Sequence, residues 1–211
     1  IYYVIFYLSL YRDVQGKFQW SEAIAIWDGG LAIYGGVIGG ILTCLVVCKH
    51  KKLPFLAMAD LSVMGLFIGQ IMGRWGNFVN QEAYGGTCDL PWRMGLIVDG
   101  QLITVHPTFL YESLWNLMGL CLLFFVVRRV RRFDGELFLC YLGWYGLGRF
   151  WIEGLRTDSL YLFDTGIRVS QLVALMSVLV AAALLVRMRV FVKPDPQKMW
   201  VHRATENNQA K

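Results

Sequence analysis

The stretch "PFLAMADLSVMGLFIGQIMG", residues 54–73, decides the fold class because it is a mostly apolar run long enough to cross a lipid bilayer. A transmembrane helix needs about 20 such residues, with a lower limit of about 17. Comparable runs lie on both sides of it, at 31–48, 106–127, 135–154 and 168–187. We therefore predict an all-α polytopic membrane protein, a helical bundle with five full spans.

The composition favours the same class. Of the 211 residues, 56% are hydrophobic, 15% aromatic and 17% charged, and the mean hydropathy is +0.48. Soluble domains carry about 25% charged residues. The net charge of +5 could indicate a nucleic-acid partner, but the basic residues cluster beside apolar runs, where control of topology explains them. We therefore predict membrane lipids, and no nucleic acid, as partners.

The five cysteines indicate packing rather than chemistry. Four of them lie in apolar runs, Cys88 lies in a polar connection, and no pair has the CxxC spacing of a metal or redox motif. A free cysteine in an apolar run behaves as a small hydrophobic residue. We predict no metal and no cofactor.

The other segments complete a predicted single transmembrane domain over residues 1–211. Residues 1–11 are apolar but too short to span, so we expect a partial N-terminal helix in a natural protein that starts further upstream. Residues 12–30 mix tryptophans with charges, as in an amphipathic arm on the interface. Residues 87–105 contain a proline and a DG turn signal, which predicts a small β-like extracytoplasmic head, and residues 194–211 form a predicted cytoplasmic tail.

The positions of lysine and arginine predict the orientation. Basic clusters at 49–52, 128–132 and 187–193 each follow an apolar run, and such clusters are enriched in cytoplasmic loops. The runs at 54–73 and 135–154 then cross outward. The polar stretches at their ends are therefore expected on the extracytoplasmic side.

The outward ends carry a set of polar side chains that is rich in arginine and amide groups. The guanidinium group offers a planar fork of donors that fits phosphate oxygens, so arginines that face one cavity suit a phospholipid head group. No GxSxG or HExxH motif is present. The candidates are Tyr34, Arg74, Asn77, Asn80, Glu82, His106, Tyr111, Glu112, Tyr145, Arg149, Glu153 and Arg156.

Several of these side chains have two interpretations. Arg149 lies inside an apolar run, where a charge costs about 2.5–3.5 kcal/mol and usually marks function, but it also has the i,i+4 spacing of a structural pair with Glu153. His106 fits an interfacial hydrogen bonder as well as a catalytic group. Arg74 and Asn77 have the i,i+3 spacing that places both on one helical face if the helix continues that far. Gly73 and Gly76 allow the chain to leave the helix, after which Asn80 and Glu82 could fold back over the same cavity.

Glycines at every fourth position form a second pattern. Gly65, Gly69 and Gly73 fall on one helical face, as in small-xxx-small faces that let two helix backbones approach closely in lipid. We expect a packing role for these glycines.

The stretch "GRWGNFVNQE", residues 73–82, closely resembles the signature of bacterial prolipoprotein diacylglyceryl transferases at every fixed position. Supporting blocks follow in the order of that family, "WDGGLAIYGGVIGG" at 27–40, "HPTFLYES" at 106–113 and "GRFWIEGLRTD" at 148–158. The resemblance covers essentially the whole chain. It implies a family fold of seven spans, of which the first and part of the second would lie upstream.

The resemblance also implies an activity. Such an enzyme transfers the diacylglyceryl group of phosphatidylglycerol to the lipobox cysteine thiol in the signal peptide of a preprolipoprotein, forms a thioether and releases glycerol phosphate. It would lie in the bacterial inner (plasma) membrane with its active site toward the extracytoplasmic side. By the same resemblance Arg74 and Arg149 contact the phosphate. The other implied site residues are Asn77, Asn80 and Glu82 in the signature and Tyr145, Glu153 and Arg156 in the last block.

The base that takes the thiol proton stays open. A thiol of pKa about 8.5 needs a base or a nearby positive charge to become a nucleophile. Many members of the family have histidine where this chain has Tyr34, and tyrosine is a poor base at neutral pH. We expect Tyr34 to position groups, and Glu82 or His106 to remove the proton.

Two functions of other classes are alternatives to this interpretation. A non-enzymatic transporter of anionic lipid or solute would also use arginines to bind an anion, but it predicts paired hydrophobic repeats, and no convincing repeat is visible. An intramembrane protease would need a nucleophile and base pair, which the sequence does not show.

Overall fold

The computed structural model describes residues 33–98, 100–157 and 168–202, apart from the side chains of Ile33, Tyr34 and Val98. The predicted partial helix at 1–11 and the predicted arm at 12–30 lie outside the described residues. The chain divides into two compact units, Ile1–Phe55 and Leu56–Lys211, which are treated separately.

The described part of the first unit is helix α3, Ile33–Lys51. It covers the predicted run at 31–48 and ends in the basic residues Lys49, His50 and Lys51. Positive side chains at the C-terminus of a helix complement its macrodipole. The backbone then turns at Lys52, whose φ is +53°.

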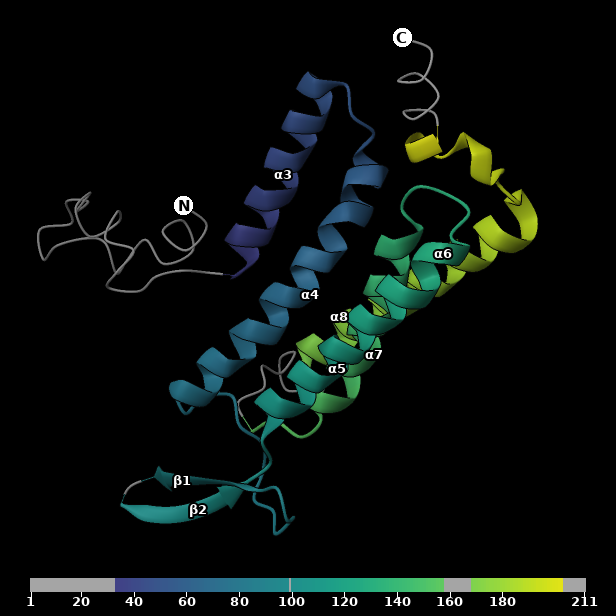
Figure 1. The fold of residues 1–211 in the computed structure, drawn as a ribbon. Helices are drawn as coiled ribbons and strands as arrows, with labels where there is room; N and C mark the ends of the chain where they lie inside the picture. The colour runs from purple at the N-terminus through teal and green to yellow at the C-terminus, as the bar shows by residue number, and fades with distance from the viewer. Residues whose placement is uncertain (1–32, 99, 158–167, 203–211) are drawn as a thin grey trace, which may run out of the picture. The chain divides into compact units, whose positions relative to one another are not determined.

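The described part of the second unit is mostly helical and contains a β-hairpin (Figure 1). Its helices cover the other four predicted runs. The elements are α4 Phe55–Val79, β1 Met94–Val98, β2 Gln101–Val105, α5 Thr108–Leu122, η3 Leu123–Val127, α6 Arg128–Val130, α7 Glu136–Glu153, α8 Val169–Val186, η5 Arg187–Val192 and η6 Pro196–Lys198.

Three described helical stretches are long and apolar enough to cross a membrane: Phe55–Val79, Thr108–Val130 and Val169–Val192. The class predicted from the sequence, an all-α membrane protein, is therefore confirmed. Helix α7 is more polar, because its 18 residues include the charged side chains Glu136, Arg149 and Glu153. The count of five full spans stays a prediction.

The segment between α4 and α5 contains a two-stranded antiparallel hairpin, as the pattern at 87–105 predicts. Its strands pair with Val98 opposite Gln101, and Gly100 in the turn has a φ of +76°, which favours glycine. Leu96 and Val105 are buried, whereas the paired side chains of Ile97 and Leu102 are exposed. Because side chains alternate between the faces of a strand, the hairpin has one packed face and one exposed apolar face.

The buried core of the second unit joins α4, η3 and α7. Its fully buried side chains are Val63, Phe67, Leu123, Leu137 and Tyr141. The ring of Phe67 meets that of Tyr141 edge-on at 5.0 Å, and Gln70 Nε2 donates a 2.7 Å hydrogen bond to Tyr141 Oη. Such packing and interhelical hydrogen bonds drive helix association in lipid.

Trp115 and Trp144 connect α5 to α7 through a reciprocal pair of hydrogen bonds, which we call the tryptophan clasp. Trp115 Nε1 donates to the backbone oxygen of Trp144, and Trp144 Nε1 donates to the backbone oxygen of Trp115, each at 2.9 Å. The two rings stack with their centroids 4.6 Å apart. Glycines provide the room for them, because a Cβ atom at Gly119 would lie 2.5 Å from the Trp144 ring and one at Gly148 would lie 2.2 Å from Trp115 Nε1.

The predicted packing role of the α4 glycines is not seen in the described chain. Among the described residues, no heavy atom comes within 4 Å of a Cβ atom built at Gly65, Gly69 or Gly73. Close helix approach occurs instead on α5 and α7, at Gly119, Gly148 and other positions that face a large side chain or a neighbouring backbone.

Replacing Gly148 with alanine is expected to destabilise the protein by about 1–3 kcal/mol, the usual cost of overpacking a well-packed core. The new methyl group would displace Trp115 and break its hydrogen bond to α7. Thermal unfolding in detergent measures the effect. The matched control is Gly69→Ala, which should not lower the melting temperature because alanine is the better helix former. Equal melting temperatures for the two variants would refute the clasp.

Buried carboxylates organise the opposite end of α7 from Glu153. Asp60 of α4 accepts backbone hydrogen bonds of 2.9 Å from Gly135 and Phe138, which satisfies donors in the first turn of α7. Glu136 is fully buried, accepts a 2.6 Å hydrogen bond from the backbone nitrogen of Arg132 and pairs with Arg189. This end of the unit holds ion pairs of its own.

Candidate functional site

The signature stretch forms the last turns of α4. Of the two possibilities that the sequence leaves open, the helix continues: α4 runs unbroken through Gly73 and Gly76 to Val79. Neither glycine has a described neighbour that would force a bend. The helical i,i+3 spacing places Arg74 beside Asn77, and Arg74 Nη1 donates a 3.1 Å hydrogen bond to Asn77 Oδ1.

After Val79 the chain turns back over the helix end. Gln81 and Ala83 have positive φ angles of 54° and 57°, which reverse the backbone. Glu82 Oε1 then accepts hydrogen bonds from Asn77 Nδ2 at 3.0 Å and from Asn80 Nδ2 at 3.2 Å. The predicted fold-back of Asn80 and Glu82 is therefore present, although its hinge lies beyond the glycines.

Glu112 of α5 joins Arg74 and Arg149, two arginines that lie far apart in the sequence. Glu112 as a whole is 4% exposed, with Oε2 2.5 Å from Arg74 Nη2 and Oε1 2.9 Å from Arg149 Nη1. Arg149 Nη1 donates a hydrogen bond to Oε1, whereas the contact of Arg74 with Oε2 is an ion pair. The polar stretches at 73–82 and 148–158 therefore meet at the side chain of Glu112.

Glu153 completes the arginine–carboxylate cluster, which we define as Arg74, Glu112, Arg149 and Glu153. Arg149 Nη2 lies 2.7 Å from Glu153 Oε2, a charge contact without the angles of a hydrogen bond. The structural i,i+4 pair considered from the sequence is therefore present. The side chains of Arg74 and Arg149 remain 20% and 18% exposed, whereas both carboxylates are buried. Two positive and two negative charges balance inside the cluster.

His106 lies in a separate hydrogen-bonded group. Its Nδ1 atom is 3.2 Å from Tyr111 Oη, which also accepts a 3.0 Å hydrogen bond from Trp92 Nε1. The backbone of His106 pairs with Gly85 and Gly86 through 3.0 Å hydrogen bonds. Among the described residues, the side chain of His106 contacts Tyr111 and no member of the arginine–carboxylate cluster.

The other predicted site residues lie at different places. Tyr145 is partly buried and stacks on Tyr141 of the core at 5.8 Å. The backbone of Arg156 forms an antiparallel bridge with Gly85, so the segment after α7 lies beside the segment after α4. Tyr34 falls in the first turn of α3, and its side chain lies outside what the structure describes.

The sequence indicates the central role of Glu112 only in part. The sequence places Glu112 near the predicted extracytoplasmic end of the run at 106–127 but assigns this residue no specific role. The signal that selects Arg149, a charge within an apolar helix, applies equally to Glu112 because its neighbours in α5 are mostly apolar. Among the described residues, no group of three or more histidine, cysteine, aspartate or glutamate side chains could hold a metal ion.

The fold and the site together define an α-helical membrane protein with an arginine–carboxylate cluster at the ends of its helices. A family model described as prolipoprotein diacylglyceryl transferase matches residues 1–187. The match covers most of the chain, including every residue of the cluster. The chain belongs to the prolipoprotein diacylglyceryl transferase family.

Similar proteins carry the name phosphatidylglycerol–prolipoprotein diacylglyceryl transferase. The one from Lysinibacillus sphaericus is 43% identical over 204 residues, which covers 92% of this chain and 72% of the relative. The one from Finegoldia magna is 46% identical over 184 residues, covering 87% and 69%. The one from Clostridioides difficile is 44% identical over 179 residues, covering 85% and 67%.

Proposed function

We propose that this protein transfers the diacylglyceryl group of phosphatidylglycerol to the lipobox cysteine thiol of a preprolipoprotein. The observation that carries the proposal is the pair of guanidinium groups on one buried carboxylate, Glu112. Two arginines fixed in this way form a preorganised site for an anionic phosphate. The names of the similar proteins support the same substrates.

In the proposed reaction the thiolate attacks the phosphate-bearing carbon of the diacylated glycerol unit of phosphatidylglycerol. A carbon–sulfur bond forms, the carbon–oxygen bond to the phosphate breaks, and glycerol phosphate leaves with the bonding electron pair. The growing negative charge on the phosphate is stabilised by Arg74 and Arg149. Each terminal nitrogen of a guanidinium group carries two hydrogens, so one carboxylate contact per nitrogen still leaves donors for the phosphate.

Glu82 is the group we propose to take the thiol proton. Both amide hydrogen bonds to its carboxylate go to Oε1, and no hydrogen bond to Oε2 occurs among the described residues. The side chain is exposed, and Asn77 connects it to Arg74. Oε2 is therefore available to accept a proton beside the phosphate site. His106, hydrogen-bonded to Tyr111, is the alternative base.

Replacing Glu82 with glutamine should lower the transfer rate at neutral pH by about 100-fold, within the usual range for losing a general base. Glutamine keeps the Oε1 acceptor, so the hydrogen bonds from Asn77 and Asn80 can persist. Rates measured from pH 6 to pH 9.5 test the role, because the variant should recover as the thiol ionises without help. A loss of transfer rate in Glu82→Gln that stays constant across this pH range would contradict the role. So would a pH-dependent loss in His106→Gln together with an unchanged rate in Glu82→Gln.

We further propose the topology that the basic clusters predict. In it five helices span the bacterial plasma membrane, the hairpin forms a small extracytoplasmic head, and the arginine–carboxylate cluster faces the extracytoplasmic side. The clusters at 49–52, 128–132 and 187–193 then lie in the cytoplasm.

The activity is tested with the purified protein in phosphatidylglycerol vesicles and a peptide that contains a lipobox. We expect a mass increase of one diacylglyceryl group on the cysteine and release of an equal amount of glycerol phosphate. A serine-for-cysteine peptide and phosphatidylcholine vesicles should give no product. Passage of anionic lipid or solute across the membrane without any thioether would favour a transporter instead.

A further inference from the structure

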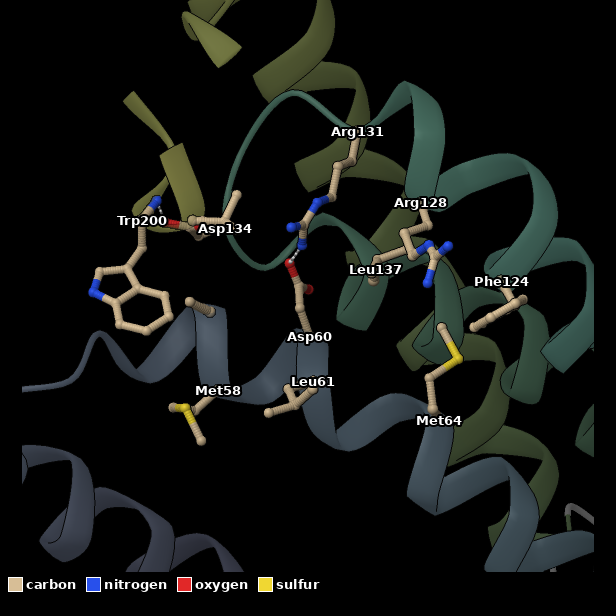
Figure 2. A pocket seen from close by; sticks show the side chains of 12 residues that line it. Met58, Asp60, Leu61, Met64, Phe124, Arg128, Arg131, Asp134, Leu137 and Trp200 are labelled. Carbon is tan, nitrogen blue, oxygen red and sulfur yellow. Dashed lines mark hydrogen bonds and ion pairs between the residues drawn. The ribbon is translucent and has the colours of Figure 1, made fainter. Parts of the chain in front are cut away.

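A cavity lies far along α4 from the arginine–carboxylate cluster. It has a volume of about 350 Å³ and lies between the first turns of α4, the end of the α5–η3–α6 helix, the start of α7 and residues 200–201 (Figure 2). Asp60, which lines it, precedes Arg74 by almost four helical turns on one continuous helix. A rise of about 1.5 Å per residue separates the two places by about 20 Å.

Most of the cavity wall is apolar. Leu61 and Met64 of α4 and Phe124 of η3 form one side of it, and Leu61 is 69% exposed. Figure 2 shows Met64, Phe124 and Arg128 grouped together, with Trp200 and Asp134 at the other end of the cavity. An exposed apolar wall at the end of membrane-spanning helices suits a hydrocarbon chain.

The two acidic side chains in the wall already have partners. Asp60 accepts hydrogen bonds from the backbone of Gly135 and Phe138 and contacts Arg131 at 3.5 Å. Asp134 accepts a 3.0 Å hydrogen bond from the backbone nitrogen of Trp200. These contacts use the carboxylates within the protein.

Arg128 differs from Arg131 in its contacts. Its guanidinium carbon lies 4.2 Å from the centre of the Phe124 ring, and no carboxylate contacts it among the described residues. A cation over a ring uses the face of the guanidinium group and leaves the N–H donors at its edge available. Those donors can form a bidentate contact with a phosphate.

We propose that this cavity binds an anionic phospholipid, with its phosphate on Arg128 and one acyl chain along Leu61, Met64 and Phe124. Basic pockets between membrane helices are a general mode of binding for such head groups. The cavity volume fits a head group and the first part of one chain, so the rest of the lipid would lie in the bilayer. This site is separate from the proposed transfer site.

Native mass spectrometry of the full chain, released from phosphatidylcholine nanodiscs with increasing phosphatidylglycerol, tests the proposal. We expect Arg128→Gln to weaken retention of one phosphatidylglycerol molecule by about tenfold, the loss of one charge-assisted contact. The matched control is Arg129→Gln, because Arg129 is its exposed neighbour and does not line the cavity. All of these variants are made in an Arg149→Ala background, so that phosphatidylglycerol held at the proposed transfer site does not enter the comparison.

Two further measurements identify the ligand. Leu61→Asn should also weaken retention, because it removes apolar contact with the chain, and millimolar inorganic phosphate should not compete. Competition by phosphate with no effect of Leu61→Asn would mean a site for free anions and would overturn the proposal. Equal retention by Arg128→Gln and Arg129→Gln would overturn it as well. Transfer activity enters none of these measurements.

Discussion

Arg149→Ala is expected to reduce thioether formation by at least about 100-fold, the range seen when one preorganised donor to a developing anion is removed. The guanidinium group of Arg149 contacts Glu112 at 2.9 Å and Glu153 at 2.7 Å, so its position is fixed before any phosphate arrives. Alanine removes the positive charge and both contacts. The assay is diacylglyceryl transfer to a lipobox peptide in phosphatidylglycerol vesicles.

The matched control for this variant is Arg189→Ala. Arg189 also pairs with a buried carboxylate, Glu136, at the opposite end of α7 from Glu153. Both variants leave a buried carboxylate without its arginine and should lose comparable stability, but only Arg149→Ala should lose transfer beyond the loss of folded protein. Arg149→Lys should be intermediate, since an ammonium group keeps the charge without the planar fork. Full activity of Arg149→Ala would remove Arg149 from the mechanism.

Glu112→Gln is the second substitution with a large expected effect. The neutral amide cannot hold two guanidinium groups through charge, so Arg74 and Arg149 should both move. A displacement of about 1 Å in a catalytic group can cost about 100-fold in rate, and we expect a loss of that size in transfer. Because Glu112 acts through the arginines, the variant should lower the turnover rate and also weaken phosphatidylglycerol binding.

Glu136→Gln is the control for Glu112→Gln, since Glu136 is a buried carboxylate that pairs with an arginine away from the site. A merely structural role of Glu112 predicts that the two variants lose the same stability and keep the same turnover per folded molecule. Our interpretation predicts a difference in turnover and in the dissociation constant of phosphatidylglycerol. Glu112→Asp should recover part of the rate, because the charge returns on a shorter side chain.

The elements of the fold follow from the sequence to a large extent. Apolar runs of about 20 residues predict helices by length alone, and each of the five predicted runs corresponds to a helical stretch, although α4 continues six residues past the end of its run. The hairpin follows from a turn signal between short apolar runs. These patterns are local, so a single chain contains all the information that they need.

The contacts between helices follow from the sequence to a smaller extent. Glycine spacing favoured the face of Gly65 and Gly69, but the close approaches occur at Gly119 and Gly148, where a tryptophan of another helix needs space. No local pattern specifies which glycine faces which ring. Glu112 illustrates the same limit at the site, since its importance comes from two arginines on different helices and becomes visible only when the helices are placed together.

The tryptophan clasp has a consequence for the site at the ends of the same helices. Each indole is bonded to a backbone oxygen of the other helix, so α5 and α7 cannot slide along each other without breaking both bonds. Glu112 comes one turn before Trp115, and Arg149 lies little more than one turn after Trp144. A slip of one turn, about 5.4 Å, would separate Arg149 from Glu112. The clasp therefore aligns the carboxylate of Glu112 with the guanidinium group of Arg149. The spacing of the proposed anion site is thus fixed by two hydrogen bonds that lie outside the site itself.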